Sequence, residues 1–67
     1  MNFRLEQPVR VHPKTWLLRR YSGWLGTVDT VEMEADGQWT YRVKFQDEPG
    51  QGYPYYASEL EAISLRG

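Results

Sequence analysis

The stretch Trp39-Thr40-Tyr41-Arg42-Val43-Lys44-Phe45 alternates large apolar and polar residues without interruption. Successive side chains of a β-strand point to opposite faces, so the stretch predicts a strand with one apolar and one polar face. The apolar face would hold Trp39, Tyr41, Val43 and Phe45, and the polar face Thr40, Arg42 and Lys44. A half-buried strand of this kind is typical of a small all-β domain.

The length of the chain, 67 residues, predicts a single domain over 1–67 with frayed ends at 1–6 and 65–67. A chain near this size buries only about 60% of the surface that its unfolded form exposes. The sequence holds no cysteine, which excludes a disulfide framework and a thiolate metal site. No apolar run approaches the roughly 20 residues of a membrane span, and no signal-peptide pattern is present, so we expect a cytoplasmic protein.

The charge of the chain is nearly balanced, with a net charge of −1 at pH 7. Such a chain has no global field that attracts nucleic acid or an acidic membrane. Cations nevertheless gather early in the sequence. Residues 1–28 hold five Lys or Arg and one acid, whereas residues 29–67 hold three cations and eight acids.

Four further short strands are predicted, over 8–12, 24–34, 53–57 and 61–65. In the first of them Val9 and Val11 would point inward, and in the third Pro54 indicates an edge position. Residues 13–23 predict a long loop, for which a helix of at most two turns is the alternative. Residues 57–60 predict a single 3₁₀ turn before the last strand.

The strand over 24–34 changes parity along its length, because its apolar residues are Leu25 and Val28, then Val31 and Met33. A change of parity predicts a bulge or bend, and Gly26 is the natural pivot. The Asp36-Gly37 pair that follows is a strong hairpin signal. Five short strands, a long first loop and a 3₁₀ turn before the last strand are typical of an SH3-like small barrel. The alternative is a five-stranded OB-like barrel.

Catalytic and metal-binding patterns are nearly absent. The only histidine is His12, and none of Ser22, Ser58 and Ser64 lies in a nucleophile-elbow sequence. No phosphate-binding glycine loop or metal-ligand spacing is present. We therefore expect no catalytic residues, no metal, no cofactor and no enzymatic activity.

Aromatic residues are the most unusual part of the composition: three Trp, five Tyr and two Phe make up 15% of the chain. The interior of so small a barrel cannot hold ten rings, so some are expected outside, where exposed aromatic clusters mark binding surfaces. We predict a non-enzymatic protein-binding module, with nucleic-acid binding as an alternative. The predicted partner-binding residues are Trp16, Arg19, Arg20, Tyr21, Trp24, Tyr53 and Tyr55.

Four short motifs resemble a recurring SH3-like barrel pattern: Val9-Arg10-Val11, Gly26-Thr27-Val28, Tyr41-x-Val43-x-Phe45 and Ala57-x-Glu59-Leu60-Glu61. The pattern is similar to the SH3-like peripheral subunit of photosystem I and to the variable chain of ferredoxin–thioredoxin reductase. These are non-catalytic proteins that dock electron-transfer partners. The resemblance implies an SH3-like barrel and a protein partner.

A second, local resemblance is to type II dihydrofolate reductases, on Tyr41-Arg42-Val43, Pro49-Gly50, Gln51-Gly52-Tyr53-Pro54 and Leu60-Glu61-Ala62-Ile63. That family is a tetramer of SH3-like barrels whose central pore binds folate and NADPH. The resemblance implies Gln51 and Tyr53 as pore residues and Lys14 as the counterpart of the pore lysine. The chain departs from that family at Gly52, where the family has an apolar residue, and by two additional residues within 55–58.

Overall fold

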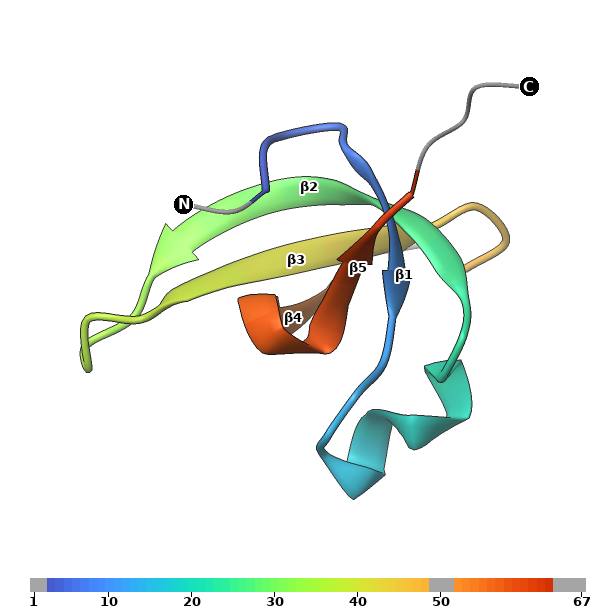
Figure 1. Ribbon diagram of the computed structural model, residues 1–67, viewed down its shortest axis with the longest axis horizontal. Coiled ribbons are helices and arrows are strands. Elements are labelled where there is room, and N and C mark those ends of the chain that lie inside the picture. The colour runs from blue at the N-terminus through green and yellow to red at the C-terminus, as the bar shows by residue number, and fades with distance from the viewer. Residues whose placement is uncertain (1–2, 49–51, 64–67) are drawn as a thin grey trace.

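The computed structural model describes residues 3–48 and 52–63, and shows a mostly β protein (Figure 1). Its elements are β1 (Pro8–Val11), the 3₁₀ helix η1 (Trp16–Tyr21), β2 (Leu25–Met33), β3 (Trp39–Phe45), β4 (Tyr53–Tyr56), the 3₁₀ turn η2 (Ala57–Glu59) and β5 (Leu60–Ala62). The five strands form one antiparallel sheet in the order β4-β3-β2-β1-β5. Because the edge strands β4 and β5 do not pair with each other, the sheet is not closed.

The alternation predicted for β3 is confirmed for Tyr41, Val43 and Phe45, which are buried. Trp39, predicted on the same apolar face, lies at the start of the strand and is 39% exposed. Thr40 differs from the prediction. It lies on the polar face and is nevertheless buried, since its hydroxyl donates to Glu34 Oε2 at 3.1 Å. Ten residues make the core: Phe3, Val9, Val11, Tyr21, Val28, Tyr41, Val43, Phe45, Tyr55 and Leu60.

The irregularity predicted for β2 exists, but it lies at Asp29 and not at Gly26. The register with β3 shifts between Val28 and Thr30, which leaves Asp29 as the bulged residue. Gly26 instead faces the core, where an added Cβ would meet the Lys44 carbonyl oxygen at 2.7 Å. Leu25, its neighbour, therefore points outward and is 53% exposed, so the prediction that Leu25 is inward is wrong.

The long connection between β1 and β2 contains η1, which corresponds to the helical alternative at this position. Its N-cap residue, Thr15, makes no side-chain capping bond, and Tyr21 is its only buried residue. Tyr21 thus fixes the end of this connection to the core. Its start is fixed by Glu59 of η2, whose buried carboxylate accepts from the backbone N–H groups of Lys14 (2.7 Å) and Tyr56 (2.9 Å). Figure 1 shows η1 below the sheet, at the opposite end of β2 from the turn that joins β2 to β3.

The N-terminal segment is more ordered than predicted. Phe3 is buried and packs edge-on against Tyr41 at 5.3 Å, and the Glu6 backbone N–H donates to the Val28 carbonyl at 2.7 Å. Residues 3–6, where fraying is expected, therefore contact β2 and β3. Residues 1–2 and 65–67 lie outside the described residues.

The aromatic residues divide between interior and surface, as the composition predicted. Five rings are buried and Tyr53 is half-buried. The four exposed rings are Trp16, Trp24, Trp39 and Tyr56. The expectation that ten rings exceed the capacity of the core is confirmed.

The helical segments of the described ranges, 3–48 and 52–63, include none with the length and apolar character that crossing a membrane requires.

Candidate functional site

Tyr21 is the centre of an aromatic cluster at the end of η1. Its ring stacks on Phe45 with centroids 5.1 Å apart, meets Trp24 edge-on at 4.9 Å and lies 5.0 Å from Tyr53. Trp24 also meets Phe45 edge-on at 5.2 Å. These contacts join η1, the start of β2, the end of β3 and the start of β4. They hold the Trp24 ring in one orientation at the surface.

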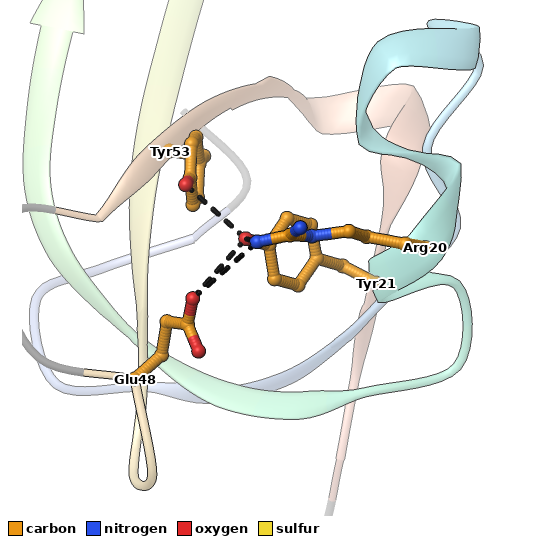
Figure 2. A network of polar contacts seen from close by, with 4 residues as sticks. All are labelled: Arg20, Tyr21, Glu48 and Tyr53. Atoms are coloured by element: carbon orange, nitrogen blue, oxygen red, sulfur yellow. Dashed lines mark hydrogen bonds and ion pairs between the residues drawn. The ribbon is translucent and has the colours of Figure 1, made fainter.

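Figure 2 shows three side chains converging on the Tyr21 hydroxyl. The hydroxyl accepts a hydrogen bond from Arg20 Nη2 at 2.6 Å, and lies 3.1 Å from the Tyr53 hydroxyl and 3.3 Å from Glu48 Oε1. A phenol has one proton, so Tyr21 donates to only one of these two groups at a time. Arg20 also lies over the Tyr21 ring at 4.8 Å and approaches Glu48 at 3.6 Å. The network ties the loop after β3 to η1.

The surroundings of Tyr21 raise its pKa. The hydrogen bond with Tyr53 raises the pKa of Tyr21 most strongly and burial adds to it, while Arg20 opposes both. A phenol whose pKa is raised is a poor nucleophile or base at neutral pH. We interpret the network as a structural support for the surface beside it.

That surface is built on two consecutive apolar side chains, Trp24 and Leu25, which are 40% and 53% exposed. One depression of about 330 Å³ is lined by Pro8, Leu25, Gly26, Thr27, Lys44, Phe45 and Gln46. A second, of about 270 Å³, is lined by Trp24, Leu25, Phe45, Gln46 and Asp47. The two share Leu25, Phe45 and Gln46. We call the region formed by Pro8, Trp24, Leu25, Thr27, Lys44 and Gln46 the Leu25 surface.

The strand register explains why these residues lie together. Leu25 on β2 is directly opposite Arg10 on β1, and Thr27 is opposite both Pro8 on β1 and Lys44 on β3. Directly opposite residues of an antiparallel pair point to the same face. The outward face around Leu25 therefore carries an apolar centre with a cation on each neighbouring strand.

The predicted site residues are only partly brought together. Arg20, Tyr21, Trp24 and Tyr53 form one cluster around the Tyr21 hydroxyl and ring. Trp16 is 73% exposed on η1 and makes no ring contact with the aromatic residues of 3–48 and 52–63, and Arg19 is an exposed residue of the same helix.

Two of the predicted contact residues are not available to a partner. Tyr55 is buried with 1% exposure, so its prediction as a surface residue is wrong. Tyr21 is equally buried, and its ring serves the core. Alternation along β4 directs Tyr53 and Tyr55 inward and leaves Tyr56 exposed.

Neither Leu25 nor Lys44 was predicted as a site residue. Leu25 was missed because the bend was placed at Gly26, which turned Leu25 inward. Gly26 pairs with the inward residues Val9 and Phe45, so Gly26 faces the core and its neighbour Leu25 faces outward. This pairing is the signal that identifies Leu25. Sequence reasoning also missed a shallow depression of about 270 Å³ beside η2. It is lined by Gly37, Gln38, Trp39, Tyr41, Tyr56, Ala57 and Ser58.

Two of the residues implied by the type II reductase resemblance, Gln51 and Tyr53, lie at the start of β4 or before it. Gln51 lies outside the described residues, and the Tyr53 hydroxyl is engaged with Tyr21 at 3.1 Å. A side chain at Gly52 would overlap the backbone of Val43, so the apolar residue of that family does not fit here. Within 3–48 and 52–63, no group of three or more His, Cys, Asp or Glu residues is placed to hold a metal ion.

Comparison with protein-family models, with curated proteins and with solved structures finds no match to this chain.

Proposed function

We propose that this protein is a non-enzymatic binding module that recognises a protein partner through the Leu25 surface. The observation that carries the proposal is the exposure of Trp24 and Leu25 at the junction of two depressions. Exposed apolar side chains that are held rigidly favour binding, because little conformational entropy remains to be lost on association. The Tyr21 cluster supplies that rigidity beneath Trp24.

We also propose that the open sheet is an SH3-like barrel. The strand order β4-β3-β2-β1-β5, the long β1–β2 connection and the one-turn η2 before β5 support this proposal. Such folds host many unrelated functions, so the fold supports a binding role only weakly and the surface must carry the argument. The absence of cysteine fits action in a reducing cytoplasm.

The test compares two matched leucine variants, Leu25→Ser and Leu17→Ser. Both side chains are exposed, at 53% and 65%, but only Leu25 lines the depressions. Each variant and the unchanged protein are used as bait in lysate of the source cell, and captured proteins are quantified by mass spectrometry. A captured protein is then purified and its affinity for all three baits is measured.

The expected result is a partner that binds the unchanged protein and Leu17→Ser alike, and binds Leu25→Ser at least about tenfold more weakly, which corresponds to about 1.4 kcal/mol. Circular dichroism first establishes that both variants are folded. A partner whose affinity is equal for Leu25→Ser and the unchanged protein would refute the proposal.

A second candidate function is nucleic-acid binding by η1, favoured by one observation. The exposed ring of Trp16 shares η1 with Arg19, which forms no ion pair with any described residue. Exposed rings and cations together bind single strands by stacking and phosphate contact. This candidate predicts affinity for an oligothymidine that falls steeply with added salt and is weakened by Trp16→Ala. Affinity that is independent of salt or of Trp16 would exclude it.

A further inference from the structure

We infer that the Leu25 surface takes an acidic peptide segment carrying one large apolar side chain. This inference rests on the proposed function and adds the chemistry of the partner. It is drawn from the charges beside Leu25, from the size of the first depression and from the position of Asp47. The charges and the position of Asp47 are additional to the exposure of Trp24 and Leu25, which carries the proposed function.

The charges beside Leu25 are cationic and unpaired. Arg10 is directly opposite Leu25 on β1, and Lys44 flanks Thr27 on β3. Both are exposed, and neither forms an ion pair or a side-chain hydrogen bond with another described residue. The acid directly opposite Arg10 on β5 is Glu61, whose Oε1 accepts from His12 Nε2 at 2.9 Å.

Two cations near this surface, Arg42 on β3 and Arg20 on η1, are by contrast paired. Arg42, on the same face of β3, donates to Glu32 at 3.0 Å and to the Gly52 carbonyl at 3.0 Å. Arg20 is bound to Tyr21 and lies 3.6 Å from Glu48. Arg10 and Lys44 are thus free to meet carboxylates of a partner. A neutral or basic partner that covered them would leave two desolvated charges without compensation.

The first depression sets the size of the apolar group. Its volume of about 330 Å³ is near the lower end of the roughly 300–1,000 Å³ typical of ligand pockets. Most of its lining is apolar, from residues that include Pro8, Leu25 and Phe45, and Lys44 and Gln46 also line it. It therefore suits a single leucine, methionine or phenylalanine side chain with its polar backbone left at the rim.

Asp47 gives the occupant a direction. It lines the second depression with Trp24, whereas Lys44 lines the first and is opposite Thr27, two residues beyond Leu25 along β2. Arg10 is opposite Leu25 on β1 and lines neither depression. Carboxylates of the segment would be repelled by Asp47 and attracted by the two cations. The acidic residues therefore lie over Arg10 and Lys44, and the part of the segment that crosses Trp24 is neutral.

The test is a selection from a random twelve-residue peptide library displayed on phage, using the folded full chain as target. Enriched peptides are synthesised, and their affinity is measured by fluorescence anisotropy at low and high salt. The variants are the single change Leu25→Ser, the double change Arg10→Glu with Lys44→Glu, and a matched control of equal charge change, Lys14→Glu with Arg19→Glu. An oligothymidine is measured in parallel.

The expected peptides carry two or more Asp or Glu beside one large apolar residue. Their affinity falls at least about tenfold with Leu25→Ser and with the Arg10 and Lys44 pair, and decreases with added salt. The control pair leaves their affinity within about twofold. Peptides that depend on Leu25 but are neutral or basic would overturn the acidic-segment inference while leaving the proposed function intact.

Two other outcomes point elsewhere. Enriched peptides that bind Leu25→Ser as well as the unchanged protein would overturn both the inference and the proposed function. An oligothymidine that binds through Arg10 and Lys44 more tightly than any enriched peptide would overturn the inference in favour of a nucleic-acid ligand. Because Arg10, Leu25 and Lys44 are exposed, their substitution removes no buried contact, and circular dichroism checks that each variant is folded.

Discussion

Replacement of Glu59 by alanine should strongly lower the free energy of unfolding, because one buried carboxylate holds two distant segments together. Glu59 is 5% exposed. Its Oε2 accepts from the Lys14 backbone N–H at 2.7 Å, and its Oε1 accepts from the Tyr56 backbone N–H at 2.9 Å. The first bond fixes the start of the β1–β2 connection, and the second begins η2.

The magnitude follows from these two bonds. A hydrogen bond to a charged group contributes about 1.5–3 kcal/mol, and a buried donor left unpaired costs about 1–3 kcal/mol. The Lys14 end lies near solvent and regains water, so we expect the free energy of unfolding to fall by about 2–4 kcal/mol in total. A chain of this length is stable by roughly 3–10 kcal/mol, so the loss is a large part of the whole.

The bond to Tyr56 has a second consequence at the edge of the sheet. Pro54 of β4 has no backbone N–H, and the N–H of Tyr56 is taken by Glu59. An edge strand without free donors is a poor template for pairing with another chain. The Glu59→Ala variant should therefore also associate more readily at high concentration, which sedimentation velocity measures.

The assay is urea unfolding followed by tryptophan fluorescence and circular dichroism. Glu59→Gln serves where Glu59→Ala does not fold, because the amide keeps one acceptor and turns an N–H donor toward the other backbone N–H. Glu59→Gln should lower the free energy of unfolding by about 1–3 kcal/mol. Glu61→Gln is the control, since it alters an exposed pair with His12 and should change the free energy by less than about 1 kcal/mol. A Glu59→Ala variant within about 0.5 kcal/mol of the unchanged protein, or no more affected than Glu61→Gln, would refute the reasoning.

Three further predictions concern the core. Tyr55→Phe should leave the free energy of unfolding unchanged or raise it by about 1 kcal/mol in urea unfolding, because the buried Tyr55 hydroxyl has no hydrogen-bond partner among the described residues; a loss above about 1 kcal/mol would contradict this. Burial raises the pKa of Tyr55 to about 12, whereas a tyrosine of the unfolded chain has a pKa of about 10. The free energy of unfolding should therefore be constant with respect to this group below pH 10, and should decline by on the order of 1–2 kcal/mol as the pH rises toward 12. Tyr55→Phe should flatten that decline in the same urea assay, and an unaltered decline would assign it to other groups. Gly26→Ala should lower the free energy of unfolding by about 2–3 kcal/mol, because its Cβ would meet the Lys44 carbonyl oxygen at 2.7 Å. Gly37→Ala, with φ of 85° and open space around it, should lower it by about 1 kcal/mol. A lower melting temperature for Gly37→Ala than for Gly26→Ala would show that the close approach at Gly26 relaxes freely.

Local pattern was sufficient where the two faces of a strand differ strongly. The apolar alternation of β3 and the inward Val9 and Val11 of β1 were predictable from period two alone. The turn was predictable from the Asp36-Gly37 pair as well. The structure agrees, because Gly37 has a positive φ of 85°, which glycine adopts without strain. Each of these depends on a few neighbouring residues.

The candidate site was less predictable, because its parts come from strands that are far apart in sequence. Whether Leu25 faces the core or the solvent depends on the position of the bulge, and Val28, Val31 and Met33 fit a bulge at either Gly26 or Asp29. Val9 and Phe45 lie opposite Gly26 and leave no room for a side chain there, so Gly26 faces the core and the bulge lies at Asp29. That information belongs to neighbouring strands and not to the sequence of β2.

The amino-acid sequence by itself determined the β class, the approximate strands and the excess of rings over interior space. Only the tertiary structure decided which rings stay outside and which cations stand beside them. Strand periodicity is local, so a single chain segment reveals it. Exposure depends on register between strands, and a shift of one residue moves a side chain from one face of the sheet to the other.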